Sequence, residues 1–497
     1  MAFPGKGRTR RTVAETFAAR SARRAKSVFE HPLASRYASA EMLHLWSPQH
    51  RHSTWRRIWV ALAEAQRALG LPITAAQIRA MRRAVDDIDF AAAARYERKL
   101  RHDVMAHIHA FGDAAPAARG IIHLGATSMD VVDNADLIIL HDALDLLIGR
   151  LQAAIEPLAR FAERYADLPT LGYTHLQPAQ LTTVGKRACL WLEELRQDLW
   201  NLVRARGNLK LRGLRGATGT QASFLALLGT AAKVRRLEEK FVRKLGFHFA
   251  YPVCGQTYSR KVDADIVFAL ASFAAGVQRI CNDIRLLASF KEMDEPFEAQ
   301  QVGSSAMPYK RNPMRCERAT GLARYLLSLA TSPPMTLAAQ MFERTLDDSA
   351  NKRLVMPEAF LAADAILILL HSIFAGLVVY PAVIRARVEA ELPFIATENI
   401  LMEAVRRGGD RQKLHERIRR HALAAAEQVK QHGRPNDLIE RLKADAAFAR
   451  VRWQRVLDPR KYVGLAPQQT REYLEKRVRP LFKWPIWKPA HAPKPTV

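Results

Sequence analysis

A long repeat of apolar residues most constrains how this chain folds. Its members recur at alternating spacings of four and three residues: Ile266, Leu270, Phe273, Val277, Ile280, Ile284 and Leu287. A second series of the same kind runs through Leu137, Leu140, Leu144, Leu147, Leu151 and Ile155, and Pro157 follows it as an expected kink. Such seams are typical of long helices packed side by side, so the sequence predicts an all-α fold with a central long-helix bundle.

The length of the chain predicts more than one packed unit, because 497 residues with 49% hydrophobic content exceed one ordinary core. We place one boundary at the loop Gly125–Asn134 and another at Pro381. Strand signals are scarce, and Phe247–Val253 is the best candidate. The predicted division is a basic tail over 1–30, a helical N-terminal domain over 31–126, the bundle over 127–380 and a helical C-terminal domain over 381–497.

The stretch Ala359–Ile384 is apolar and long enough to cross a bilayer, although Asp364, His371 and Pro381 interrupt it. A helix that is apolar on all sides is either a membrane span or the centre of a large helical core. A single candidate in an otherwise soluble pattern favours the core, so we expect no membrane association.

The net charge of +27 fits either a nucleic-acid-binding protein or an enzyme with polyanionic substrates. Charge alone reports non-specific attraction, so it predicts no specific nucleic-acid partner. The basic tail over 1–30 resembles an organellar transit peptide in composition, but a disordered segment is the simpler interpretation. The four cysteines form no C-x-x-C pair and no dense framework, which favours a reducing, cytoplasmic setting.

Two sequence patterns resemble ligand-binding motifs but lack the residues or the spacing that such motifs require. The series Gly213, Gly216 and Gly219 lacks the G-K-[ST] ending of a nucleotide loop and follows no predicted strand, so we interpret it as a tight turn between helices. His107 lies two residues before His109 and five after His102, so no H-x-x-x-H pair exists on one helix face. The sequence therefore predicts no metal there.

The segment Gly303–Pro313 has the composition of a mobile loop between two helical patterns. It holds a glycine, two adjacent hydroxyls, a lysine, an arginine and two prolines. Pro308 and Pro313 keep it from joining either helix, and loops of this sort often close over a substrate. Composition alone equally fits a plain surface loop.

The sequence of this loop, G-S-S-A-M-P-Y-K-R-N-P, resembles the signature loop of the fumarase and aspartase superfamily. Five further stretches resemble the animal-type branch of the adenylosuccinate lyase family within it: residues 32–37, 100–107, 174–180, 255–261 and 342–351. The resemblance covers nearly everything after residue 31. It implies a bundle that assembles into a homotetramer with a shared helical core, whose active sites combine loops from three subunits.

The resemblance also implies a reaction, the anti elimination of fumarate from adenylosuccinate to give AMP, and from the related succinyl-carboxamide ribotide of purine biosynthesis. A poorly acidic proton beside a carboxylate must leave, which requires a positioned base and donors around that carboxylate. By resemblance Ser304 is the base, Lys310 and Asn312 bind the carboxylate, His175 protonates the leaving nitrogen, and Glu317 orients His175. No cofactor and no metal are implied.

Further residues are assigned to the substrate by the same resemblance. His102 is a second histidine of the site, between Arg101 and Asp103. Arginine suits paired contacts with phosphate and carboxylate groups, and several should converge on this substrate. The remaining substrate-binding residues implied are Arg36, Tyr37, Thr127, Ser128, Thr174, Gln256, Arg318, Arg344, Ser349 and Arg353.

Three other functions are alternatives to this interpretation. Another lyase of the superfamily, such as argininosuccinate lyase, shares the loop, but the arginines directed at a phosphate oppose it. A non-catalytic, crystallin-like member would have no need of Ser304, Lys310, His175 and Glu317, all of which are present. A nucleic-acid-binding protein rests on charge alone, and steep salt dependence of its binding to unrelated DNA would support it.

Overall fold

Long helices form where the two apolar seams run. The computed structural model describes residues 27–483 and 493–495, so most of the tail predicted over 1–30 lies outside the described residues. One seam lies in α7 (Ser128–Arg164), which contains Pro157, and the other lies in α11 (Lys261–Ser289). Every residue of both seams is buried, which confirms the prediction of packed long helices.

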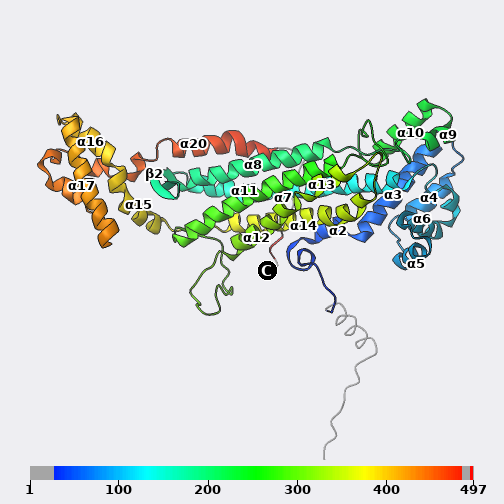
Figure 1. Ribbon diagram of the computed structural model, residues 1–497, viewed down its shortest axis with the longest axis horizontal. Helices are drawn as coiled ribbons and strands as arrows, with labels where there is room; N and C mark the ends of the chain where they lie inside the picture. Colours follow the sequence, from blue (N-terminus) through cyan, green and yellow to red (C-terminus); the bar gives the residue numbers. More distant parts are fainter. Residues whose placement is uncertain (1–26, 484–492, 496–497) are drawn as a thin grey trace, which may run out of the picture.

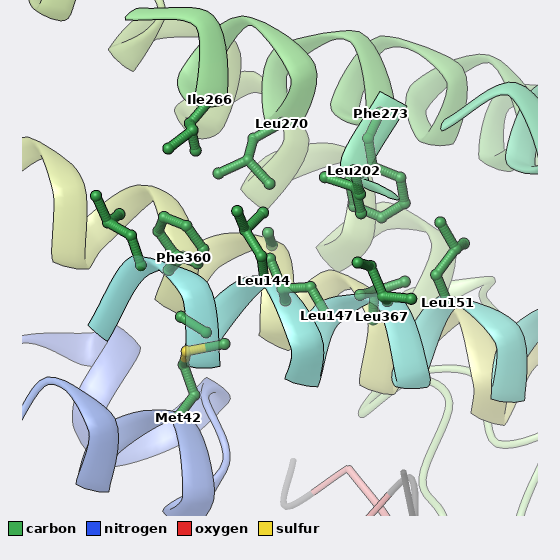
Figure 2. Close-up of a cluster of buried hydrophobic side chains, with 14 of the residues drawn as sticks. Met42, Leu144, Leu147, Leu151, Leu202, Ile266, Leu270, Phe273, Phe360 and Leu367 are labelled. Atoms are coloured by element: carbon green, nitrogen blue, oxygen red, sulfur yellow. The ribbon is translucent and has the colours of Figure 1, made fainter. Parts of the chain in front are cut away.

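Three more helices complete the bundle: α8 (Val184–Asn208), α12 (Met314–Leu329) and α14 (Asp347–Ala375). Helix α7 packs against α8 and α14, and α11 packs against α8 and α12. Figure 2 shows apolar side chains from these helices meeting in the interior, among them Leu144, Leu202, Leu270 and Phe360. The mostly helical architecture agrees with the predicted fold class.

Shorter helices cover the end of the bundle where α7 begins (Figure 1). Polar N-caps fix several of their starts, since Ser39, Ser47, Thr74 and Asp89 each accept a hydrogen bond from a backbone N–H in the first turn. The elements of this region are η1 (Leu33–Tyr37), α2 (Ala40–Leu45), α3 (Pro48–Arg67), α4 (Ala75–Arg83), α5 (Phe90–Leu100), α6 (Asp103–Ala114), η2 (Pro116–Ile121), α9 (Ala222–Leu228), α10 (Ala231–Lys244) and α13 (Ser332–Ala339).

The opposite end of the molecule carries the C-terminal helices (Figure 1). A second hydrophobic core joins them, from Ala396 to Val456, while the chain from Val463 to Leu481 returns to the main core. These elements are α15 (Pro381–Ile395), α16 (Thr397–Arg406), α17 (Arg411–His432), α18 (Leu438–Ala444), η3 (Ala446–Phe448), α19 (Trp453–Val456), η4 (Pro459–Lys461), α20 (Ala466–Tyr473), η5 (Leu474–Val478) and η6 (Arg479–Lys483). The predicted domain boundaries stay predictions, because the main core includes side chains from both sides of each.

The predicted apolar stretch 359–384 is not one helix. Helix α14 ends at Ala375, and a short strand, β4 (Val378–Val379), separates it from α15. Helices α11 and α14 are both long and apolar enough to cross a membrane, and their most apolar windows are 56% and 78% buried inside the protein. Asp364, which interrupts the stretch, is fully buried and forms an ion pair with Arg150 of α7. Burial with a partner explains this apolar helix as part of the core.

The strand prediction for Phe247–Val253 was wrong. That segment makes only an isolated bridge between Ala250 and Leu211, because no neighbouring strand is available to it. The hairpin instead joins β1 (Pro169–Thr174) and β2 (Gln177–Thr183), which pair antiparallel and pack against α15. A second small pair joins β3 (Met293–Asp294) to β4.

The boundary predicted as a loop over Gly125–Asn134 was too long at its C-terminal side. Helix α7 already begins at Ser128, where a capping box between Thr127 and Asp130 starts it. The glycine series was correctly predicted as a turn between helices. Gly213, Gly216 and Gly219 lie between α8 and α9, and all three have positive φ values that suit glycine.

Candidate active site

Seven of the predicted site residues line one pocket of about 890 Å³ near the start of α7. Its walls come from α3, α5, α6, α7 and α14. We call these seven the pocket group: Arg101, His102, Asp103, Ser128, Arg344, Ser349 and Arg353. They come from three separate stretches of the sequence, so folding alone makes them neighbours.

The His102 ring is held in a defined orientation by the start of α6. His102 is the N-cap of this helix, and its Nδ1 accepts a hydrogen bond from the backbone N–H of Met105 at 3.3 Å. An accepting Nδ1 leaves the proton of the neutral ring on Nε2, which lies 3.4 Å from Ser128 Oγ. Arg101, in the left-handed conformation, turns the chain from α5 into this cap. His102 therefore presents a hydrogen-bond donor to the pocket.

Ser128 occupies the first turn of α7, beside a buried carboxylate that orders this turn. Asp130 accepts the Thr127 N–H at 2.8 Å and the Arg215 N–H at 2.7 Å, and it forms an ion pair with Arg212. Thr127 does not line the pocket but fixes where α7 begins.

Two of the three arginines of the pocket group already have partners within the chain. Arg353 binds the carboxylate of Asp103 at 2.8 Å, and Arg344 donates to Gln256 Oε1 at 3.1 Å. Gln256 therefore adjoins the pocket through Arg344. Arg36 and Tyr37 lie on η1, which packs against α14, but neither lines the pocket.

Two histidines in the pocket wall, His107 buried and His52 half-buried, remain uncharged near neutral pH. His52 and His107 stack with ring centroids 3.7 Å apart, and Trp55 packs against both with its edge. Burial lowers the pKa of His52 to about 3 and that of His107 to about 4. Neither ring is thus suited to donate a proton from its charged form at neutral pH.

Thr174 and His175, the hairpin pair, lie in the exposed turn between β1 and β2. Both His175 and Leu176 have positive φ values, of 54° and 58°, although neither is glycine. A two-residue hairpin with both central residues in this region is a tight turn that side chains other than Gly, Asn and Asp rarely occupy. Such a strained backbone often marks a functional residue.

The predicted signature loop is a loop, between β3 and α12. Its base is closed by Asn312, whose amide donates to the Gly303 carbonyl at 2.7 Å. Ser304 Oγ accepts the Met307 N–H at 3.1 Å and so organises a turn within the loop. Lys310 is exposed and forms no ion pair within the described residues. Ser304 is half-buried, whereas Lys310 is open to solvent.

Both ends of this loop are joined by a buried carboxylate. Glu295, just before the loop, accepts the backbone N–H groups of Arg315 at 2.8 Å and Cys316 at 2.9 Å, in the first turn of α12. This arrangement caps a helix whose N-cap is Pro313, which supplies no side-chain cap. The same first turn carries Glu317 and Arg318. With Ser304, Lys310 and Asn312 these two residues make up the loop group.

A single chain does not bring the three groups together. Helix α7 has 37 residues, which span about 55 Å at about 1.5 Å per residue, and it begins at the pocket and ends before the hairpin. Figure 1 shows β2 and α6 near opposite ends of the molecule. The predicted contact between Glu317 and His175 is also absent from the described residues; Glu317 lies 3.8 Å from Arg285 instead.

Sequence inspection missed a set of charged side chains beneath the pocket. Asp133, Asp136, Arg260, Asp348 and Lys352 line its floor and bind one another. The available signal was spacing, because Asp348 and Lys352 each directly precede a predicted residue on α14. Within the part of the chain that the structure describes, no group of three His, Cys, Asp or Glu side chains is placed to hold a metal ion.

Comparisons with known proteins agree with this architecture. Residues 48–327 match a family described as Lyase, and residues 393–473 match a family described as Adenylosuccinate lyase C-terminus. The chain is 54% identical to adenylosuccinate lyase of Saccharomyces cerevisiae, covering 90% of this chain and 94% of that protein. It is 48% identical to adenylosuccinate lyase of Schistosoma mansoni, covering 91% and 95%.

Solved structures with the same fold are more distant in sequence. The 3-carboxy-cis,cis-muconate lactonizing enzyme from Pseudomonas putida has a TM-score of 0.79 at 23% identity, covering 90% of this chain and 99% of that one. A fumarate lyase from a Mesorhizobium species has a TM-score of 0.75 at 24% identity, covering 90% and 100%. These likenesses concern the fold.

Proposed function

Because this chain belongs to the adenylosuccinate lyase family, we propose that it is a lyase that releases fumarate from adenylosuccinate to leave AMP. We further propose that it splits the related succinyl-aminoimidazole-carboxamide ribotide to the carboxamide ribotide, the second such step of purine nucleotide biosynthesis. The likeness to curated relatives along nearly the whole chain carries this proposal. A reducing, cytoplasmic location is part of it, supported by four free cysteines.

The loop group performs the first half of the proposed reaction. Ser304, as its alkoxide, takes the proton from the carbon beside a carboxylate, and the electron pair moves to form the C=C bond of fumarate as the C–N bond breaks. Lys310 and Asn312 hold the carboxylate whose charge grows in the transition state. The exposed position of Lys310, and the place of half-buried Ser304 in the same loop, support this role, because a closing loop can carry both to a substrate.

The hairpin pair performs the second half. His175 gives its proton to the departing nitrogen, and Glu317 supports the charged form of that ring. The exposed, strained turn that holds His175 supports the assignment. His52 and His107 are unsuited to replace it, since desolvation lowers the pKa of both rings and keeps them neutral.

The pocket group binds the nucleotide in this proposal. Arg344, Ser349 and Arg353 face the phosphate, while Arg101, His102 and Ser128 contact the succinyl side. Arginine guanidinium groups suit both a phosphate and the two carboxylates of this substrate. Arg36, Tyr37, Gln256 and Arg318 complete the contacts.

We propose that the protein is a homotetramer with shared sites, and the separation of the pocket from the hairpin supports sites made by more than one chain. Helix α7 alone separates the pocket from the hairpin by about 55 Å, so a site using both His102 and His175 needs them from different chains. Closed symmetric assembly supplies such neighbours.

The test incubates the purified protein with adenylosuccinate and follows fumarate release, beside Ser304→Ala and His175→Ala. We expect turnover by the unaltered chain and a loss of at least about 100-fold in each variant, as removal of a base or an acid typically costs about 100- to 10,000-fold. Absence of fumarate from the unaltered chain would refute the function. Full activity of Ser304→Ala would refute the role of the loop.

A further inference from the structure

Two charged residues on α14 lie directly behind the substrate side of the pocket. Asp348 and Lys352 are four residues apart, so they share one face of the helix, while Ser349 and Arg353 share the next. Asp348 is fully buried and Lys352 is 11% exposed, whereas Arg353 is 53% exposed. The first turns of α14 thus present an inner charged face to the bundle and an outer polar face to the pocket.

Asp348 joins the bundle to the pocket. One of its oxygens accepts two hydrogen bonds from Arg260, from Nε at 2.9 Å and from Nη2 at 2.6 Å. The other accepts a hydrogen bond from Arg344 Nη2 at 3.4 Å. Arg260 in turn donates to Asp133 of α7 at 3.1 Å. The guanidinium of Arg344 is therefore held through a continuous chain of charges that begins on α7.

Lys352 makes the second connection, one turn further along α14. Its Nζ lies 3.1 Å from Asp136 Oδ2 on α7 and donates to the Tyr258 hydroxyl at 2.8 Å. That hydroxyl donates to Asp263 of α11 at 2.6 Å. Lys352 thereby fixes α14 against both long helices of the bundle.

The charged side chains of this network pair mainly with one another. Four carboxyl groups, those of Asp133, Asp136, Asp263 and Asp348, surround only two central cations, Arg260 and Lys352, with Arg344 and Arg51 as the nearest further cations. Buried charges are retained only when paired and hydrogen-bonded. Such a network fixes geometry more than it adds stability, because desolvation offsets much of the attraction.

We propose that Asp348 and Lys352 are positioning residues that hold Arg344, Ser349 and Arg353 in the arrangement that binds the phosphate of the substrate. The proposal rests on the proposed function and names two residues outside the predicted site. Asp348 sets the direction of the Arg344 guanidinium, and Lys352 sets the place of the helix turn that carries Ser349 and Arg353.

The test compares Asp348→Asn and Lys352→Met with the unaltered protein on adenylosuccinate and on its dephosphorylated nucleoside, succinyladenosine. We expect KM for adenylosuccinate to rise about tenfold or more, equivalent to about 1.4 kcal/mol of binding free energy, with a smaller change in kcat. The activity on succinyladenosine, measured at low substrate, should change by less than about twofold, because no phosphate is bound. A merely structural defect would lower both activities alike.

Matched controls and a compensating variant separate positioning from folding. Asp265→Asn and Lys261→Met make the same changes at exposed positions of α11 and should leave both activities unaltered. The double variant Lys352→Met/Asp136→Asn loses one positive and one negative charge together. We therefore expect its thermal unfolding midpoint to recover, while its KM for adenylosuccinate stays raised.

Binding of AMP to each variant, measured by calorimetry, distinguishes two kinds of failure. An unaltered chain without turnover refutes the proposed function. Turnover by the unaltered chain, with unchanged KM and AMP affinity in Asp348→Asn and Lys352→Met, refutes the positioning role. Equal losses on both substrates, or recovery of KM in the double variant, refute it as well.

Discussion

His102 illustrates how one side chain serves both the helix and the site. Its Nδ1 caps α6, which leaves Nε2–H for the pocket. Two substitutions distinguish the role of His102 as a helix cap from its role in the pocket. His102→Asn keeps an acceptor suited to an N-cap but loses the imidazole, whereas His102→Ala loses both.

We therefore expect His102→Asn to retain the thermal stability of the unaltered protein while turnover falls by about 100-fold or more. His102→Ala should show the same loss of turnover and lose about 1 kcal/mol of stability as well. Fumarate release and chemical denaturation measure the two effects. If Asn and Ala destabilise the protein equally, the ring is not the cap that the structure describes.

Gly303 fills a position where no side chain fits. A Cβ at this residue would overlap the carbonyl oxygen of Lys310, within the same loop. Gly303→Ala must therefore move Lys310 or open the base of the loop. We expect kcat to fall by at least about tenfold, because misplaced catalytic groups lose much of their rate.

Gly321→Ala is the matched control for this change. Gly321 lies inside α12, and a Cβ there has open space around it. Alanine should raise stability by up to about 1 kcal/mol through its higher helix propensity, with unaltered kcat. A normal kcat in Gly303→Ala would show that the close approach to Lys310 has no part in catalysis.

The residues that sequence inspection missed share one property, which is burial of charge. Asp348 and Lys352 resemble solvated surface residues of a helix when only the sequence is known. Their burial depends on α7 and α11 closing over the start of α14. By contrast, the pocket group was predicted because resemblance to the family assigned each of its residues to the substrate.

At the scale of helices, the apolar seams predicted the long helices correctly, whereas the strands were predicted poorly from the sequence. Apolar spacing identified α7 and α11 because long helices repeat one pattern many times. The hairpin β1–β2 escaped prediction because its second strand is mostly polar and its pairing depends on contact with α15. Short apolar runs such as Phe247–Val253 form no strand without a neighbour to pair with.

The interface between α8 and α11 contains an acid that should make stability depend on pH. Asp198 of α8 is 5% exposed, faces Gly276 of α11 and lies near Glu194, which pairs with Arg279. Burial, with a smaller contribution from the Glu194 charge, raises the pKa of Asp198 from 3.8 to about 7. The native state therefore holds a proton that the unfolded state has released, and stability falls as the pH rises from 3.8 to about 7.

Asp198→Asn removes this dependence, since an amide stays neutral at every pH. We expect the gain in free energy of unfolding from this substitution to be about 2 to 4 kcal/mol larger at pH 8 than at pH 4. Denaturant titrations at the two pH values measure it. Asp265→Asn, at an exposed position, should show no such difference, and an equal effect of Asp198→Asn at both pH values would refute the assignment.

At the scale of the whole molecule, the pocket and the hairpin lie at the two ends of α7. Sequence motifs named the residues of both, but no motif reports that α7 keeps the pocket about 55 Å from the hairpin. A shared site predicts that two inactive variants complement each other. In a mixture of Ser304→Ala and His175→Ala chains, some sites receive an intact Ser304 from one chain and an intact His175 from another.

The expected recovery of turnover is the fraction of sites in which both Ser304 and His175 are intact. In an equal mixture that has dissociated and reassembled at random, each of the two positions in a site is intact with a chance of one half. About one quarter of the sites are then complete, so turnover should recover to about a quarter of the unaltered value. Mixing Ser304→Ala with Lys310→Ala is the matched control, because both defects lie on one loop of one chain and no site regains an intact loop. No recovery in the first mixture after confirmed exchange of chains would mean that His175 and Ser304 act from the same chain. Recovery in the control would mean that Ser304 and Lys310 reach a site from different chains.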